Sequence, residues 1–426
     1  MEKPVSTKDM LGREALRTVE EAQVAFWHGW DPPRPGEERL SLEEALGRIT
    51  SREILSPEDL PPFPRSTVDG YAVRAADTFG ATETLPAYLR VKGEIPMGEA
   101  PRQALGPGEA LRIATGGMLP AGADAVLMLE HATEAAGELL EAVRSVAPGE
   151  NVIQRGEDVA RGERLLPPGH ALRPQDLGAL AGLGILEVWV YRKPRVAILS
   201  TGNEVVDPSV QPRPGEIRDI NAYNLTGLVL KEGGIPLRMG IVPDEREALA
   251  RALREALTAA QVVLLSGGSS VGTRDLTPQV IREAGPPGVL VHGVSIRPGK
   301  PVILARVGDV PVFGLPGHPA AVTVAFELFV QPVLEKLRGE ASVPGLQGLR
   351  TRTVRARMAR NLASSPGRED HVRVALELRD GELWAVPLLG KSGLITTLVR
   401  AAGTVVIPLT RMGIEQGEWV DVRLLA

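Results

Sequence analysis

The segment from residue 195 to residue 339 alternates short apolar runs with amphipathic helical stretches, which restricts the fold more than any other feature of the chain. Such alternation is typical of βαβ units, in which a helix connects two parallel strands of one sheet. We expect strands at 196–200, 236–242, 262–266, 289–296 and 310–315. We expect helices at 222–232, 246–258, 276–283 and 320–337. The sequence therefore predicts an α/β domain built on a parallel sheet.

The remainder of the 426-residue chain has different patterns, and this length exceeds what one hydrophobic core usually covers. Short β-type runs such as 110–114 and 125–129 are separated by glycine and proline turns, which indicates an inserted β-rich domain. Residues 371–378 and 382–388 form another pair of β-type runs, after a linker that we expect at 344–350. We predict four domains: a discontinuous helical or mixed domain (1–59 and 149–191), an inserted β-rich domain (60–148), an α/β domain (192–339) and a C-terminal β domain (340–426).

Local patterns predict the ends of several elements. Residues 12–29 have a helical pattern, and a second helix follows, where Ser41 and Glu44 are spaced as in a capping box. Asp380-Gly381 suits a tight turn between the two C-terminal β-type runs. Residues 350–360 alternate basic with apolar side chains and lack interleaved aromatic residues. We interpret them as an exposed strand and not as a nucleic-acid site.

Composition excludes several kinds of chemistry. The chain has no cysteine, which rules out disulfides, thiolate metal sites and a cysteine nucleophile. The formal net charge of −5 gives no overall basic field for binding nucleic acid or anionic lipid. The N-terminus lacks the pattern of a signal peptide, and no uncharged apolar run is long enough to span a membrane. We therefore expect a cytoplasmic protein without a nucleic-acid or membrane partner.

Three turns directly follow predicted strands of the α/β domain, at 200–204, 266–272 and 315–319. In a parallel sheet such turns emerge at one edge, outside the carboxyl ends of the strands, where ligands bind. The turn at 266–272 combines glycines, two hydroxyl groups and the start of the next helix, which favours an oxyanion or phosphate. The alternative is a plain connection in which the glycines only allow the chain to turn.

Carboxylates accompany these turns: Glu204 after the first strand, Asp244 after the second and Asp275 after the third. Two carboxylates ~4 Å apart repel by about 4 kcal/mol at an effective dielectric of 20, so gathering them around an anionic ligand requires a cation. Mg²⁺ is the simplest choice. In the alternative interpretation, Asp275 caps the helix that begins near residue 276 and Asp244 is a solvated turn residue.

Two further patterns do not indicate a known site. Gly390-Lys391-Ser392 resembles the end of a phosphate-binding P-loop, but Ala385 occupies the required glycine position and no strand–loop–helix pattern surrounds it. The six histidines lack metal-ligand spacing, and no Ser/His/Asp set stands out. We expect each histidine to be structural or exposed.

Separated motifs over nearly the whole chain resemble the molybdopterin molybdenumtransferase family, the relatives of bacterial MoeA and of the gephyrin E domain. They are Leu60-Pro61-Pro62-Phe63, Ser66-Thr67-Val68-Asp69-Gly70-Tyr71-Ala72, Ile113-Ala114-Thr115-Gly116, 120–126, Arg155-Gly156-Glu157-Asp158, 200–204, 266–275, Arg297-Pro298-Gly299-Lys300-Pro301 and 314–319. The resemblance implies a three-layer α/β/α molybdopterin-binding domain, a mixed helical domain, an inserted β-rich domain and a C-terminal β-barrel-like domain. It also implies a homodimer in which the α/β domain of one subunit faces the β-rich domain of the other across a shared active site.

The resemblance implies a transferase of molybdenum cofactor biosynthesis, which inserts molybdate into adenylated molybdopterin with Mg²⁺-dependent cleavage and release of AMP. The implied catalytic and metal-binding residues are Asp69, Glu204, Asp244 and Asp275. We expect substrate binding by Thr115, Gly267, Gly268, Ser269, Ser270, Lys300, Pro316 and Pro319. We also expect transient contacts with other enzymes of cofactor biosynthesis.

Two other functions fit parts of this pattern: adenylation of molybdopterin, and a non-catalytic scaffold like the gephyrin relative. The β-rich segments argue against the first, and retention of all four carboxylates argues against the second. The chain departs from the family at several positions. The family usually has Val where Ser269 stands, Asp or Glu in place of Thr273, Lys in place of Arg297 and Asn in place of His318, and it often has Asp-Asn in place of Pro64-Arg65. These departures leave the choice between molybdate and tungstate open.

Overall fold

The computed structural model describes residues 16–135, 138–267, 276–341 and 352–425. The chain forms two compact units, one of residues 1–39, 47–51 and 189–426 and the other of residues 40–46 and 52–188. The strands β1 (Glu37–Ser41) and β12 (Glu187–Tyr191) lie where the chain passes from one unit to the other. The predicted linker at 344–350 is outside the described residues, and the four domain boundaries remain predictions.

A six-stranded sheet in the order β16-β13-β17-β21-β20-β18 forms the centre of the α/β domain. The first four strands in this order are parallel, whereas β20 and β18 run antiparallel to their neighbours. The bounds are β13 (Arg195–Thr201), β16 (Ile235–Val242), β17 (Val262–Ser266), β18 (Pro287–His292), β20 (Ile303–Val307) and β21 (Val310–Leu315).

The prediction of a parallel sheet is therefore correct for four strands and wrong for the segment 289–296. That segment divides into the antiparallel edge strand β18 and the short strand β19 (Ile296–Arg297), which pairs outside this sheet. Strand β20 was not predicted from the sequence, although Gly308-Asp309 between it and β21 has the character of a hairpin turn. A hairpin needs no crossover helix, so the alternating pattern does not reveal it.

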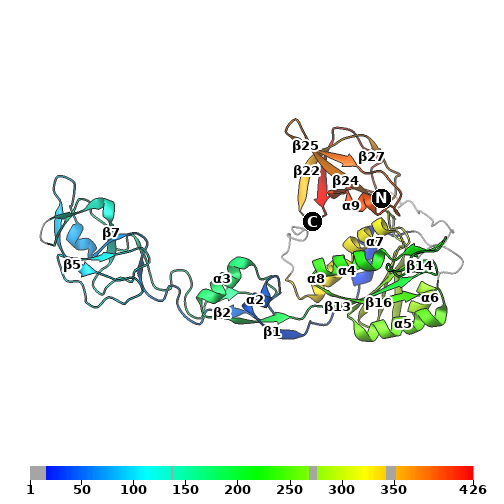
Figure 1. The fold of residues 1–426 in the computed structure, drawn as a ribbon, viewed down its shortest axis with the longest axis horizontal. Coiled ribbons are helices and arrows are strands. Elements are labelled where there is room, and N and C mark those ends of the chain that lie inside the picture. Colours follow the sequence, from blue (N-terminus) through cyan, green and yellow to red (C-terminus); the bar gives the residue numbers. More distant parts are fainter. Residues whose placement is uncertain (1–15, 136–137, 268–275, 342–351, 426) are drawn as a thin grey trace, which may run out of the picture. The chain divides into compact units, whose positions relative to one another are not determined.

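Helices cover both faces of this sheet, which confirms the three-layer α/β/α arrangement (Figure 1). One face carries α5 (Arg246–Ala259) and α6 (Thr277–Ala284). The other face carries α1 (Val19–Trp27), α4 (Asn221–Lys231), α7 (Pro319–Ala325) and α8 (Gln331–Leu337). The predicted helix at 320–337 is helical throughout, but a π-helical turn, Phe326–Val330, lies between α7 and α8.

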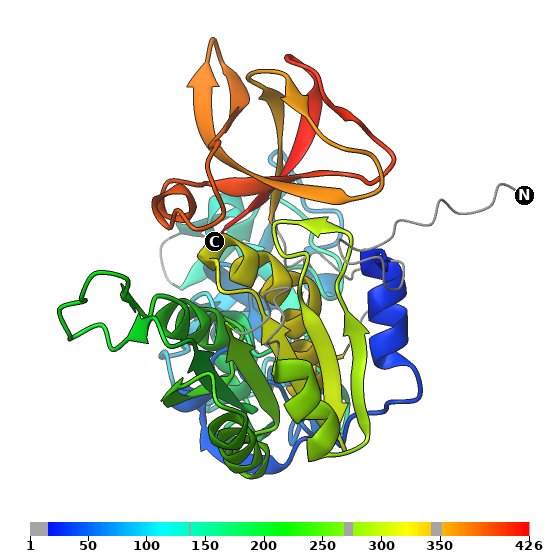
Figure 2. The same ribbon diagram turned by 90° about the vertical axis from the view of Figure 1, so that its right-hand side faces the viewer.

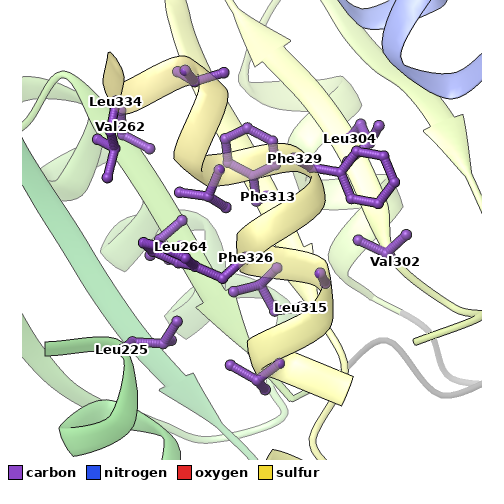
Figure 3. Packing of buried hydrophobic residues seen from close by; sticks show 14 of the residues in the cluster. Leu225, Val262, Leu264, Val302, Leu304, Phe313, Leu315, Phe326, Phe329 and Leu334 are labelled. Atoms are coloured by element: carbon purple, nitrogen blue, oxygen red, sulfur yellow. The ribbon is translucent and has the colours of Figure 1, made fainter. Parts of the chain in front are cut away.

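Alternate residues of each central strand supply two separate cores, because successive side chains of a strand point to opposite faces. Val196 and Ile198 of β13 pack on the α4/α7/α8 side, whereas Ala197 and Leu199 pack on the α5/α6 side. Figure 3 shows the first core, with Phe313 of β21 beside side chains of the α7–α8 segment. Burial of each large aliphatic or aromatic side chain contributes about 1.5–3 kcal/mol to the stability of the fold. Because both faces of the central strands are packed in this way, the positions of the strand ends are fixed.

The C-terminal residues form a closed five-stranded barrel in which the order β24-β25-β22-β28-β26 returns to β24 (orange to red in Figure 2). The strands are β22 (Thr353–Met358), β24 (Glu369–Arg379), β25 (Glu382–Pro387), β26 (Gly403–Ile407) and β28 (Trp419–Leu424), with β23 (Leu362–Ala363), β27 (Gly413–Ile414) and α9 (Thr396–Val399) beside them. Asp380 and Gly381 have positive φ angles of 51° and 81°, which confirms the predicted tight turn. The predicted exposed strand at 350–360 is β22, although its Ala356 and Met358 are buried in the barrel core.

A six-stranded sheet in the order β7-β4-β6-β5-β9-β8 forms the β-rich part of the second unit. Its strands are β4 (Gly70–Val73), β5 (Ala87–Glu94), β6 (Glu109–Ile113), β7 (Ala125–Met128), β8 (Ala132–Ala135) and β9 (Leu139–Ala142). The other elements of this unit are α2 (Leu42–Ala45), β2 (Ile54–Leu55), β3 (Arg65–Ser66), the 3₁₀ turns Ala75–Thr78 and Leu129–His131, β10 (Val152–Ile153), β11 (Arg164–Leu166) and α3 (Pro174–Gly182).

The predicted capping box at Ser41 is wrong. Ser41 is the last residue of β1, and its hydroxyl group lies 3.3 Å from the Glu44 carboxylate and caps no backbone N–H. A capping box occurs instead at Thr18, whose hydroxyl accepts from the N–H of Glu21 while the Glu21 carboxylate accepts from the N–H of Thr18. The first helix therefore begins at Val19, later than the predicted residue 12. No helix among the described residues is long and apolar enough to cross a membrane.

Candidate functional site

The turns after β13, β17 and β21 line one cavity of about 1880 Å³ at the carboxyl edge of the parallel sheet. These strands are neighbours in the sheet, so their carboxyl ends lie side by side. The cavity is lined by Thr201 at the end of β13 and by Gly202 and Glu204 after it, by Gly267 after β17, and by Pro316, Gly317 and His318 after β21. The structure thus brings together the described parts of the three turns that the sequence singles out.

Gly267 lets the turns after β13 and β17 approach each other closely. Its φ is +98°, and a Cβ atom there would lie 2.3 Å from the Thr201 carbonyl oxygen. Its N–H donates to the carbonyl oxygen of Leu315 at 3.2 Å, so this amide is engaged within the protein. The remaining candidates of this loop, Gly268, Ser269, Ser270 and Asp275, are outside the described residues.

Two of the predicted carboxylates, Glu204 and Asp244, are exposed and line this same cavity. The N–H of Asp244 donates to the side-chain oxygen of Asn203 at 3.1 Å, which connects the turn after β16 to the turn after β13. The sequence did not predict this role of Asn203, because its hydrogen-bond partner is 41 residues away in the chain. Both carboxylates are accessible to a ligand from the cavity.

Asp69, predicted as a metal-binding residue, and Thr115, predicted to bind substrate, are in direct contact in the β-rich part of the second unit. Asp69 immediately precedes β4 and Thr115 follows β6, and these strands are antiparallel partners. The Asp69 carboxylate accepts hydrogen bonds from the backbone N–H of Thr115 at 2.7 Å and from its hydroxyl group at 2.8 Å. Both hydrogen bonds lower the pKa of Asp69, and the bond from the backbone N–H makes the larger contribution. The positive charge of the nearby Arg112 lowers the pKa further. Asp69 therefore stays ionised to a lower pH than an ordinary aspartate does.

The four predicted metal-binding carboxylates are distributed over different parts of the chain. Asp69 belongs to one compact unit, whereas Glu204 and Asp244 belong to the other. In the described part of the chain, no group of three or more histidine, aspartate or glutamate side chains is arranged to hold a metal ion. Of the predicted metal-binding residues, the cavity therefore contains Glu204 and Asp244 among those that the structure describes.

The cavity is locally cationic although the chain as a whole is acidic. Lys300, which was predicted to bind substrate, lines the cavity. Arg297, one of the departures from the family, also lines it and lies three residues earlier in the chain. The C-terminal barrel and its loops add Arg368, Arg373 and Lys391, so five cationic side chains line the cavity beside the carboxylates Glu204, Asp244 and Asp370. This charge balance favours an anionic ligand.

The contribution of the C-terminal barrel was not predicted from the sequence. Arg373 of β24 is only 8% exposed, burial lowers the pKa of its guanidinium group, and its Nε has no hydrogen-bond partner among the described residues. Lys391 and Ser392 belong to the segment whose resemblance to a P-loop is not supported by its context, yet both line the cavity. The glycine-rich character of 390–393 was the only sequence signal for this wall.

A hydrogen bond joins the barrel to the turn after β21. The Ser392 hydroxyl group lies 2.8 Å from Nδ1 of His318, and the N–H of Ala320 donates to the Ser392 carbonyl oxygen at 3.3 Å. His318 is exposed, as expected for the histidines, but it lies in the cavity. Pro316 is buried and lines the cavity, whereas Pro319 is the buried first residue of α7.

Family models match three consecutive parts of the chain: the MoeA N-terminal region over residues 13–184, a probable molybdopterin binding domain over 197–336 and the MoeA C-terminal region over 355–425. A molybdopterin molybdenumtransferase of a Nostoc species is 37% identical over 391 residues, which cover 90% of this chain and 88% of the relative. The chain belongs to the molybdopterin molybdenumtransferase family.

Other members of the molybdopterin molybdenumtransferase family agree over the same length. The molybdopterin molybdenumtransferase of Bacillus subtilis is 34% identical and is aligned over 91% of this chain and 90% of its own. The crystal structure of a molybdopterin biosynthesis MoeA protein from Pyrococcus horikoshii has a TM-score of 0.80 and 39% identity, covering 96% of this chain and 99% of that one. The multidomain fold, the α/β domain and the C-terminal barrel are thus those of the molybdopterin molybdenumtransferase family.

Two departures from the usual molybdopterin molybdenumtransferase pattern, Arg297 and His318, line the cavity. Arg297 keeps the positive charge of the usual lysine, but its planar guanidinium group can form two parallel hydrogen bonds to one ligand. His318 replaces an amide side chain by a ring whose Nδ1 lies against Ser392. The departures at Ser269 and Thr273 are outside the described residues.

Proposed function

We propose that this protein inserts molybdate into adenylated molybdopterin, with cleavage of the pyrophosphate linkage and release of AMP. The observation that carries this proposal is the mixed character of the cavity, which places Glu204 and Asp244 in one space with five cationic side chains. Carboxylates suit a hard cation, and guanidinium and ammonium groups suit phosphate and a tetrahedral oxyanion. The names of the relatives agree with this chemistry.

Mg²⁺ fits the donors at this site, because Glu204 and Asp244 supply exposed carboxylate oxygens and the chain has no thiolate to favour a softer metal. We propose that these residues hold Mg²⁺ together with Asp275 and Asp69. When bound, the ion would lower the cost of the negative charge that develops on the phosphate groups.

The residues of the protein would bind and orient the two anionic reactants. Lys300 and Arg297 would bind molybdate through charge-assisted hydrogen bonds. This assignment is supported by their positions, because both line the cavity and lie three residues apart in the chain. Substrate binding by Gly268, Ser269 and Ser270 remains part of the proposal. Thr115 would act by holding the ionised carboxylate of Asp69 in one orientation, through the two hydrogen bonds described above.

We also propose that the active site is shared between the subunits of a homodimer. The proposal follows from the family resemblance, and it concerns residues of both compact units, with Asp69 and Thr115 in one and Glu204 and Asp244 in the other. If the first unit of one subunit contacts the second unit of its partner, two-fold symmetry repeats this contact once more in the dimer. Each dimer would then hold two equivalent sites.

The proposed reaction is tested by incubating the purified protein with adenylated molybdopterin and Mg²⁺, with either molybdate or tungstate. Oxyanion-dependent release of AMP, with formation of the metal-containing cofactor, is expected, and the preferred oxyanion identifies the substrate. Release of pyrophosphate from ATP in the presence of molybdopterin would instead show adenylation. Absence of both reactions in a folded, pure protein would contradict an enzymatic role.

A further inference from the structure

The β-bridge between the α/β domain and the C-terminal barrel places a buried carboxylate beside two arginines of the cavity. Strand β19 pairs in parallel with the start of β24, and Arg297 is the register partner of Asp370. Asp370 is only 4% exposed, whereas the side chain of Arg297 is 62% exposed. The bridge therefore presents one arginine to the cavity with a carboxylate directly behind it.

Asp370 also binds the second arginine, Arg368. Nε of Arg368 donates to one oxygen of Asp370 at 2.8 Å, and its Nη2 lies 3.4 Å from the other oxygen. The hydroxyl group of Ser364 donates to that second oxygen at 3.0 Å, and Nη1 of Arg297 lies 3.7 Å from it. Asp370 is thus held by one hydroxyl group and contacts two guanidinium groups that come from different domains.

The carboxylate of Asp370 reduces the repulsion between the two guanidinium groups. Two guanidinium groups that face one cavity repel each other, and long arginine side chains have many rotamers to lose on binding a ligand. A carboxylate between them offsets the repulsion and restricts both side chains before the ligand arrives. The group of three retains a net positive charge, so it still attracts an anion.

We propose that Asp370 is a positioning residue, which holds Arg368 and Arg297 in the geometry that binds a tetrahedral oxyanion in the cavity. The oxyanion would be molybdate or the phosphate group of the adenylated substrate. This inference rests on the proposed function, since it assigns the ligand of the same cavity. Asp370 would act through the two arginines, because its carboxylate is buried and is engaged by Ser364 and Arg368.

Positioning and simple electrostatics predict opposite results for Asp370→Asn. Removal of a negative charge beside the cavity should tighten anion binding if only the net charge matters. If Asp370 holds the arginines in place, its loss should weaken binding by roughly tenfold, the equivalent of one charge-assisted hydrogen bond. Asp421→Asn is the matched control, since it removes the same charge from an exposed position of β28 in the same barrel.

The experiment measures equilibrium binding of molybdate and, separately, of AMP by calorimetry, together with the KM for molybdate and kcat. Weaker binding and a raised KM in Asp370→Asn, with Asp421→Asn unchanged, would support the proposal, and the weakened ligand identifies the oxyanion. Equal or tighter binding of both ligands by a folded Asp370→Asn variant would overturn it. Arg368→Lys keeps the charge but loses Nε, so it should also weaken binding, and unchanged binding by this variant would equally overturn the proposal.

The same measurements distinguish failure of this inference from failure of the proposed function. If wild-type protein neither binds molybdate nor releases AMP, the function is wrong and Asp370 has no oxyanion site to serve. If wild-type protein does both and the two variants match it, only the positioning role is wrong. Thermal unfolding of each variant shows whether the barrel remains folded.

Discussion

The carboxylate of Asp69 is held by both hydrogen-bond donors of Thr115, its backbone N–H at 2.7 Å and its hydroxyl group at 2.8 Å. The two residues are 46 positions apart, and the antiparallel pairing of β4 with β6 brings them together. Because both bonds favour the ionised form, they lower the pKa of Asp69. This contact makes Thr115 a determinant of the pKa of Asp69.

We expect Thr115→Val to raise the pKa of Asp69, because valine keeps the backbone N–H but removes the hydroxyl donor. The pKa is measured from the Asp69 carboxyl carbon signal as a function of pH by NMR. If ionised Asp69 is required, the low-pH limit of activity should move upward in the same variant. Thr115→Ser keeps the hydroxyl group and should resemble wild type. An unchanged Asp69 titration in Thr115→Val would show that the hydroxyl bond has no influence in solution.

A shared active site predicts recovery of activity in mixed dimers. Asp69→Ala and Glu204→Ala should each be inactive as homodimers, but a mixed dimer would carry one site with both defects and one with neither. Random exchange makes about half of the dimers mixed, so roughly a quarter of all sites would be intact. AMP release is measured after the two variants are co-expressed. Purified mixed dimers that stay inactive, while each variant remains folded, would show that Asp69 does not act on the other subunit's site.

Gly267→Ala should destabilise the α/β domain by about 2 kcal/mol or more, because alanine is strained at a positive φ and its Cβ atom would collide with the Thr201 carbonyl oxygen. Gly227→Ala is the control, since Gly227 lies within α4 and its Cβ atom would meet nothing within 4 Å. That change should leave stability unaltered or raise it by up to about 1 kcal/mol. Urea unfolding measures both variants. Equal stabilities would mean that the turn relaxes around residue 267.

Asp176→Asn should lower the stability of the second unit at neutral pH by about 1.5–3 kcal/mol, the range for hydrogen bonds to charged groups. Asp176 is 5% exposed, and its carboxylate accepts from the backbone N–H and guanidinium group of Arg173 and lies 2.7 Å from Nε2 of His170. The bond from the Arg173 side chain is the main cause of a strongly lowered pKa for Asp176. Chemical denaturation of wild type and variant at neutral pH tests the loss.

The sign of the pH dependence follows from that lowered pKa. The ionised carboxylate stabilises the fold fully above the ordinary aspartate pKa, and this contribution is lost as the pH falls through the lowered folded-state value. The difference between wild type and Asp176→Asn should therefore shrink below about pH 4. Asp158→Asn, a change at an exposed aspartate of the same unit, should stay within about 0.5 kcal/mol of wild type throughout. A constant difference between wild type and Asp176→Asn over this pH range would rule out ionisation as its source.

The sequence by itself determined the elements whose side-chain pattern is local. The predicted strands at 262–266 and 310–315 match β17 and β21 residue for residue, and Asp380-Gly381 forms the expected turn. Strand and helix periodicity depend on neighbours within a few residues, so they can be recognised without knowledge of the rest of the chain. The motif resemblance added Asp69, Thr115 and Lys300, which local patterns do not identify as site residues.

Only the tertiary structure decided which side chains share the cavity. Arg373 lies in a barrel strand whose sequence pattern indicates burial but does not show what the guanidinium group faces. Lys391 belongs to the Gly390-Lys391-Ser392 motif, whose spacing alone does not indicate a site. Asp370 becomes the register partner of Arg297 because a short strand of one domain joins the barrel of another. Such contacts depend on the packing of segments far apart in the chain. A pattern within a few consecutive residues therefore cannot predict them.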